Sequence, residues 1–72
     1  MIGFEIWHDG NCIHEETGFY DADDMEQGAL DWWYELLEEE GDENPSEYIV
    51  KAFDGEGSDE MTIEELMSWW HE

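Results

Sequence analysis

The sequence predicts a small α+β domain covering residues 1–72, with the element order β-β-α-β-α and a three-stranded antiparallel sheet packed by two helices. Three observations favour this class. Apolar and polar residues alternate around an Asp-Gly pair near the N-terminus, a long central segment has apolar residues at helical spacing, and a β-branched and aromatic segment follows the only proline. A chain of 72 residues has room for one domain.

The first two strands are expected to form a hairpin. Residues 1–8 alternate, with Ile2, Phe4 and Ile6 on one side, and the following Asp9-Gly10 pair suits a two-residue turn. That turn predicts these cross-strand pairs: His8 with Asn11, Trp7 with Cys12, Ile6 with Ile13, and Glu5 with His14. Two isoleucines would then share one face of the sheet.

Residues 21–40 are predicted to form one long helix. Asp21 is a candidate N-cap, Asp23 with Glu26 is an alternative capping pair, and Gly41 is a typical helix stop. Gly28 weakens the middle of the helix by about 1 kcal/mol. The predicted apolar face consists of Met25, Ala29, Trp32, Trp33 and Leu36, with Leu30 and Leu37 at its edge.

After a polar connection at residues 42–46, residues 48–53 are predicted to be the third strand and residues 54–61 a glycine-rich acidic loop. Thr62 and Glu65 form a capping box that opens a last helix. Its apolar face contains Ile63, Leu66, Met67 and Trp70, and we expect Trp32, Trp33 and Trp70 to lie in the core. Trp69 lies off this face, as a partner contact or as edge packing.

The charge is the most unusual property of the chain. It has 23 acidic residues, one lysine and no arginine, for a net charge of −22. Disordered acidic tails are poor in aromatic residues, whereas this chain has five Trp, three Tyr and three Phe, so we expect it to fold. A single cysteine, no membrane span and no signal peptide predict a cytoplasmic protein.

Part of this charge is predicted to lie along one side of the long helix. At 100° per residue, four acidic side chains fall roughly opposite the apolar face, and we call them the acidic stripe: Asp24, Asp31, Glu35 and Glu38. Each pair of like charges at the spacing of helical neighbours destabilises the helix by about 0.2–0.5 kcal/mol. Carboxylates one helical turn apart are about 5–6 Å from each other, close to the phosphate spacing that Lys and Arg side chains span.

Other chemistry receives little support from the sequence. Residues 54–65 have oxygen donors at several positions of a calcium loop, but Asp59 stands where that loop needs glycine. His8, His14 and Cys12 lack the further ligand that a zinc site needs, so we interpret the histidines as surface residues. No nucleophile or paired-carboxylate arrangement predicts an enzyme, a catalytic residue or a cofactor.

In size, overall charge and the acidic helix at residues 21–40, the chain resembles the DNA mimics of phages and mobile elements, which include acidic anti-CRISPR and anti-restriction proteins. The resemblance implies a stoichiometric inhibitor that evades host defence. It would occupy the basic groove in which a CRISPR effector complex reads the protospacer-adjacent duplex. The predicted partner-binding residues are Asp24, Asp31, Glu35, Glu38, Glu39, Glu64 and Glu65.

The resemblance further implies a monomer or weak homodimer in the bacterial host cytoplasm, with a basic nucleic-acid-binding protein as partner and no direct contact with nucleic acid or membrane. Three alternatives stay open on the sequence: an anti-restriction DNA mimic, an acidic interaction module such as an antitoxin, and adaptation to high salt. The identity of the partner distinguishes the first two from the anti-CRISPR reading.

Overall fold

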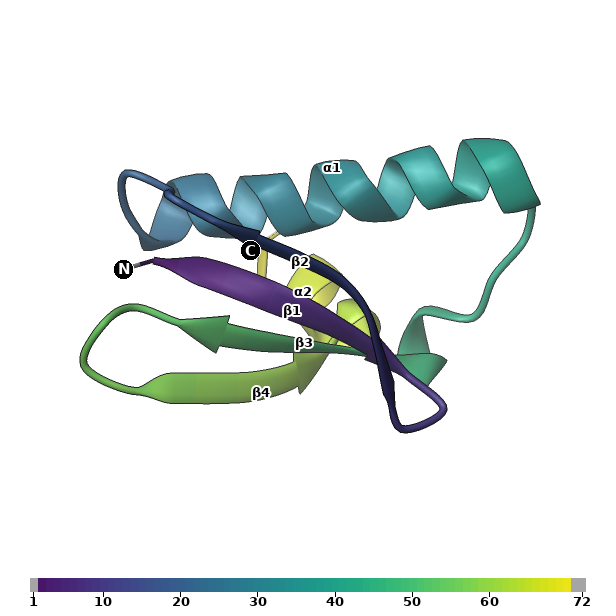
Figure 1. Cartoon of the computed structure of the whole chain (residues 1–72). Helices are drawn as coiled ribbons and strands as arrows, with labels where there is room; N and C mark the ends of the chain where they lie inside the picture. The colour runs from purple at the N-terminus through teal and green to yellow at the C-terminus, as the bar shows by residue number, and fades with distance from the viewer. Residues whose placement is uncertain (1, 71–72) are drawn as a thin grey trace.

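The computed structural model describes residues 2–70, without the side chains of Trp69 and Trp70. Its elements are β1 (Gly3–His8), β2 (Asn11–Thr17), α1 (Ala22–Glu40), a 3-10 turn η1 (Pro45–Glu47), β3 (Tyr48–Phe53), β4 (Ser58–Thr62) and α2 (Ile63–Trp70). The strands form one antiparallel sheet in the order β2-β1-β3-β4, and α1 runs across one face of it (Figure 1). The α+β class is confirmed, with four strands instead of the predicted three.

The β1–β2 hairpin follows the predicted register only next to its turn. Asp9 and Gly10 both have positive φ angles (54° and 78°), as a type I′ turn requires. Beyond the first two pairs, a bulge shifts the ladder, so that Ile6 lies opposite His14. The predicted Ile6–Ile13 pair is therefore wrong: Ile13 is the unpaired extra residue of the bulge, and it is 48% exposed.

This bulge also decides where the histidines lie. His14 shares a face with Ile6, beneath α1, and its ring stacks on Trp32 with centroids 5.5 Å apart. His8 stacks on Tyr48 at 4.2 Å. Both side chains are partly exposed (30% and 32%), so the histidines lie at the surface, as interpreted, but are partly covered by these stacking contacts.

Helix α1 begins and ends where the sequence indicates. The Asp21 carboxylate accepts a hydrogen bond from the backbone N–H of Asp24 (2.8 Å), so Asp21 is the N-cap. At the other end, the Gly41 N–H donates to the Leu37 carbonyl (2.9 Å), and Gly41 has a φ of 86°. The buried face of the helix lies slightly nearer to Leu30 and further from Trp32 than predicted. Leu30 is fully buried, whereas Trp32 is only half-buried.

Strand β4 occupies part of the segment predicted to be a loop. The Asp54 carboxylate accepts hydrogen bonds from the N–H groups of Glu56 and Gly57 (3.0 and 3.1 Å), which folds the chain back so that β4 pairs with β3. The strand was not predicted from the sequence because Asp59 and Glu60 have low strand propensity. On an edge strand such charges are typical, because they discourage pairing with other chains.

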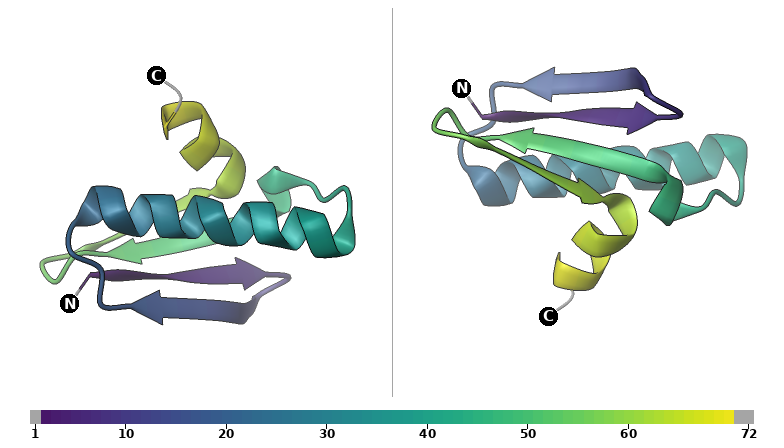
Figure 2. Two further views of the ribbon diagram at one scale, coloured as in Figure 1. Left: turned by 90° about the horizontal axis from the view of Figure 1, so that it is seen from above. Right: turned by 90° about the horizontal axis from the view of Figure 1, so that it is seen from below.

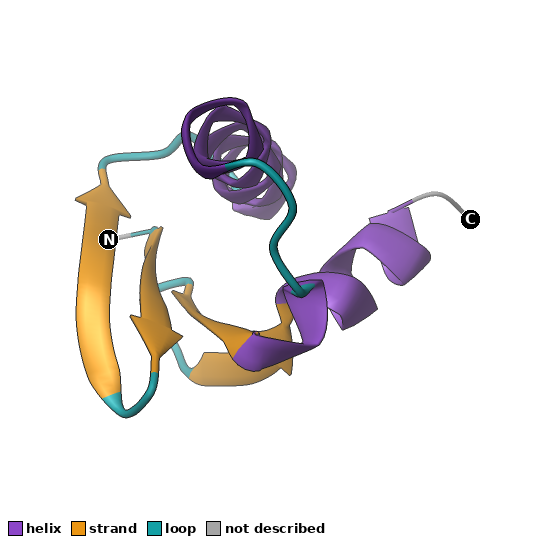
Figure 3. Ribbon diagram, turned by 90° about the vertical axis from the view of Figure 1, so that its right-hand side faces the viewer, coloured by secondary structure: helices purple, strands orange, loops and turns teal. Residues whose placement is uncertain are grey.

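The capping box that begins α2 is confirmed, since the Glu65 N–H donates to Thr62 Oγ1 (3.1 Å) and the Thr62 N–H donates to Glu65 Oε1 (3.2 Å). Figure 3 shows the sheet curling beneath α1, with α2 beyond its β4 side. The predicted core position of Trp70 and the two interpretations of Trp69 concern side chains outside the described part of the structure.

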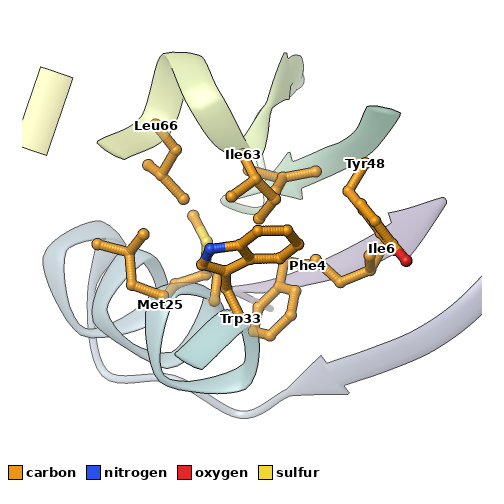
Figure 4. Packing of buried hydrophobic residues seen from close by; sticks show 11 residues of the cluster. Phe4, Ile6, Met25, Trp33, Tyr48, Ile63 and Leu66 are labelled. Carbon is orange, nitrogen blue, oxygen red and sulfur yellow. The ribbon is translucent and has the colours of Figure 1, made fainter. Parts of the chain in front are cut away.

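The core fills the space enclosed by the curled sheet and the two helices. Trp33 is 1% exposed and lies among side chains from α1, β1, β3 and α2 (Figure 4). The buried apolar residues are Phe4, Ile6, Met25, Ala29, Leu30, Trp33, Tyr48, Val50, Ala52, Ile63 and Leu66. These residues form one continuous core among residues 2–70.

Gly3 allows β1 and β2 to approach closely, so Gly3→Ala is expected to destabilise the fold by about 1–3 kcal/mol. A Cβ atom there would collide with the backbone carbonyl oxygen of Glu16 and lie 2.9 Å from Thr17 Cα. Gly57→Ala is the matched control, because a Cβ at that position meets nothing within 4 Å. Urea unfolding monitored by circular dichroism measures both variants, and equal stabilities would contradict this close approach.

Candidate functional site

The solvent side of α1 is strongly acidic. The helix carries eight carboxylate side chains, and all four members of the acidic stripe are exposed, as is Glu39. Ala29 and Trp33, on the opposite side of the helix, are at most 1% exposed. The predicted orientation of the acidic stripe is therefore confirmed, whereas its contact with a partner stays a prediction.

No cation of the described chain neutralises α1. Among residues 2–70, the ion pairs are Lys51–Glu60 (4.0 Å), His14–Glu16 (3.2 Å) and His8–Asp9 (3.8 Å), and none of them involves the helix. Lys51 lies on the outer face of the sheet, where its ammonium also sits 4.2 Å from the centre of the Trp7 ring. The helix thus presents its charge to solvent without an internal counter-ion.

The two ends of α1 differ in how the fold uses their acidic residues. In the first turn, the Asp24 carboxylate accepts a hydrogen bond from the Tyr20 N–H (3.3 Å), and the helix dipole favours anions there. The last turn contains Glu38, Glu39 and Glu40 and no basic residue, where the dipole disfavours anions. The helix dipole therefore stabilises the acids of the first turn and disfavours those of the last turn.

In the middle of the helix, strand β2 extends the acidic stripe. Asp31 and Glu35 line a recess of about 210 Å³ together with Trp32 of α1 and with His14 and Glu16 of β2. The Gln27 amide donates to Asp31 Oδ1 (3.0 Å), which orients that carboxylate. Sequence reasoning missed Glu16 because its position beneath the helix depends on the bulge in β2.

The predicted partner-binding residues of α2 lie on a different side of α1 from Asp31 and Glu35. Glu65 lines a recess with Glu26 of α1 and Asp59 of β4, and β4 is the sheet edge opposite β2. Figure 2 shows α1 from above, with β2 to one side and α2 to the other. Glu65 therefore does not extend the surface formed by Asp31 and Glu35. The preceding residue of α2, Glu64, is exposed.

Glu26 is the one carboxylate of α1 that is buried. Its side chain is 8% exposed, and its Oε2 atom has no hydrogen-bond partner among the described residues. Burial, reinforced by the negative charge of Asp23, raises the pKa of Glu26 above its ordinary value of 4.5. The helical wheel contains the signal for this residue, because Glu26 falls between Trp33 and Leu37 on the apolar side.

Because Glu26 is buried and its Oε2 atom has no hydrogen-bond partner among the described residues, Glu26→Met is expected to stabilise the isolated protein at neutral pH by about 1–3 kcal/mol. A raised pKa in the folded state means that the contribution of Glu26 to stability is greatest below the unfolded value of 4.5 and is lost as pH rises through the folded value. The gain should therefore shrink at acidic pH. Urea unfolding at several pH values, with the exposed-loop variant Glu56→Met as control, measures it.

Two metal sites were considered on the sequence: residues 54–65, and His8 with Cys12 and His14. No group of three or more His, Cys, Asp or Glu side chains within residues 2–70 is arranged to hold a metal ion, and Cys12 is exposed. Alternation along β4 directs Asp59 and Glu60 to opposite faces, so this segment does not wrap around one ion.

Hydrogen bonds from the Glu56 and Gly57 N–H groups lower the pKa of Asp54.

No protein-family model matches the chain, and comparisons with curated proteins and with solved structures find no match. None of the helices within residues 2–70 combines the length and apolar character needed to cross a membrane.

Proposed function

We propose that the protein is a DNA-mimicking inhibitor of the anti-CRISPR type, which occupies the basic, protospacer-adjacent-motif-reading groove of a CRISPR effector and blocks binding of target DNA. The observation that carries the proposal is the exposed acidic surface of α1, which has no ion pair among the described residues. On this account its counter-ions are lysine and arginine side chains of the target. The protein acts by binding and performs no chemical step.

The charge density of α1 supports the mimicry. A helix of 19 residues is about 28 Å long, and duplex DNA of that length carries roughly 17 phosphates, about half of them on one side. Seven of the eight carboxylates of α1 are exposed, which is close to that number. Glu16 of β2 adds a further negative charge beside Asp31 and Glu35, so the acidic surface is wider than the helix alone.

The energetic cost of the surface also supports a role in binding. Asp31 with Glu35, and Glu35 with Glu38, are like-charge pairs at helical contact spacing, each unfavourable by about 0.2–0.5 kcal/mol. Glu38, Glu39 and Glu40 oppose the dipole in the last turn. A binding function explains why acidic residues stand at positions where lysine would stabilise the helix.

An equilibrium binding experiment with a purified CRISPR effector tests the proposal. We expect the affinity to fall by about tenfold or more as salt rises from about 50 to about 300 mM, mostly through slower association, because the contacts are charged and steer the encounter. A type II restriction enzyme serves as a parallel arm. Binding to the restriction enzyme alone would assign the mimicry to anti-restriction, and binding to neither would overturn the proposal.

A further inference from the structure

A recess of about 320 Å³ opens on the β4 side of α1 and is separate from the acidic stripe. Its lining residues are Glu26, Asp59, Met61 and Glu65, and we call it the Glu26 recess. A smaller adjoining recess shares Glu26, Asp59 and Met61. Three carboxylates from α1, β4 and α2 thus line one recess, although they are far apart in the sequence.

The fold fixes the position of two of these carboxylates. Asp59 and Met61 lie opposite Ala52 and Val50 of β3, so both point to the face of the sheet that α1 covers. The capping box holds Glu65 through its Oε1 atom, which accepts bonds from the Thr62 N–H and hydroxyl (3.2 and 3.3 Å). Both of these bonds go to Oε1, and among the described side chains none donates a hydrogen bond to Glu65 Oε2, which can meet a ligand.

The third carboxylate gives the recess its independent indication of a ligand. Glu26 is more than nine-tenths buried, and its Oε2 atom has no partner among the described residues. An isolated buried carboxylate is unfavourable unless a cation or hydrogen-bond donor meets it. Lys51 does not, because it lies on the outer face of the sheet and pairs with Glu60.

We propose that the Glu26 recess receives an arginine side chain of the inhibited protein, with the guanidinium between Glu26, Asp59 and Glu65 and its aliphatic stem against Met61. This inference rests on the proposed function, because the arginine belongs to the same partner that the acidic stripe attracts. It adds a buried contact on the other side of α1 from Asp31 and Glu35.

An arginine fits the recess better than a metal ion does. The three carboxylates line the recess without forming a group arranged to hold a metal within residues 2–70. A guanidinium has donors along several directions in one plane, so it can serve carboxylates that arrive from three elements, and it is weakly hydrated. The thioether side chain of Met61 provides an apolar wall for the methylene groups.

The two contacts are expected to act at different stages of binding. Exposed charges such as those of the acidic stripe mainly accelerate association, whereas a desolvated charge pair mainly slows dissociation. Glu26→Gln keeps the shape of the side chain and removes its charge. We therefore expect Glu26→Gln to raise the dissociation rate from the purified target by about tenfold or more while leaving the association rate nearly unchanged.

Surface plasmon resonance on the purified target separates the outcomes. The control is Glu15→Gln, which removes one charge from the exposed side of β2. If wild type binds and neutralising the acidic stripe weakens binding, but Glu26→Gln dissociates like wild type, the arginine recess is wrong and the proposed function stands. Faster dissociation of Glu26→Gln, with its fold intact by circular dichroism, supports the recess.

A second measurement needs no partner and decides the inference if wild type binds none of the targets. N-acetyl-arginine methylamide is titrated into protein with ¹³C-labelled carboxyl groups, against sodium chloride at equal ionic strength. We expect a saturable shift of the Glu26, Asp59 and Glu65 resonances, larger than that of Asp31 or Glu35, and a lowered pKa of Glu26. Equal shifts in both groups, or the same shifts with sodium chloride, would overturn the inference.

Discussion

Neutralising three of the four residues of the acidic stripe, with Asp31→Asn, Glu35→Gln and Glu38→Gln together, is expected to weaken binding to the target roughly 100-fold. Each variant residue keeps its size and exposure but loses the charge that would pair with a lysine or arginine. Three lost pairs at about 1 kcal/mol each correspond to this factor. Isothermal titration calorimetry at fixed salt measures the affinity.

The same three substitutions should stabilise the isolated protein. They remove three like-charge pairs (Asp31–Glu35, Glu35–Glu38 and Glu35–Glu39) and one anion near the helix carboxyl end, together about 1 kcal/mol. The matched control is Glu15→Gln, Glu47→Gln and Glu56→Gln, which changes the net charge equally at exposed positions outside α1. Equal loss of affinity in both triple variants would show that only the total charge matters, which contradicts a defined binding face.

Trp33→Ala is expected to unfold most of the protein at room temperature. Trp33 is 1% exposed, packs its ring edge against Tyr48 with centroids 5.2 Å apart, and lies between the sheet and α2. Removing a buried Trp side chain costs about 3–5 kcal/mol. A core in a domain of this size supplies about the same amount, and self-repulsion among the carboxylates reduces it further.

The neighbouring exposed aromatic residue is the control for this substitution. Tyr34 is 45% exposed, so Tyr34→Ala should change the free energy of unfolding by about 0.5 kcal/mol or less. Far-ultraviolet circular dichroism and urea unfolding distinguish the two variants. A cooperative transition of wild-type stability in Trp33→Ala would contradict the central position of this side chain in the core.

Much of the fold was predicted from local signals in the sequence, and the structure confirms these predictions. Asp21 and Gly41 bound α1, Thr62 with Glu65 begins α2, and residues 48–53 form a strand with the predicted limits. Each signal is a hydrogen bond or backbone preference set by a few consecutive residues. The orientation of the acidic stripe followed as well, since helical periodicity alone places it opposite the buried face.

The features that the sequence did not predict depend on contacts between distant segments. Strand β4 exists because an Asp54 turn brings a charged segment of weak propensity beside β3. The bulge in β2 carries His14 beneath α1 and leaves Ile13 exposed. The Glu26 recess needs both β4 and α2 in place, so no local pattern of residues indicates it.

Direct competition with DNA tests the central claim that the acidic surface replaces a duplex on a basic site. A labelled duplex carrying the recognition motif is bound to the purified effector, and the chain is added at increasing concentration and constant salt. We predict complete displacement, with an apparent inhibition constant that rises linearly with duplex concentration. A ternary complex of effector, duplex and protein, or inhibition that is independent of duplex concentration, would contradict the account.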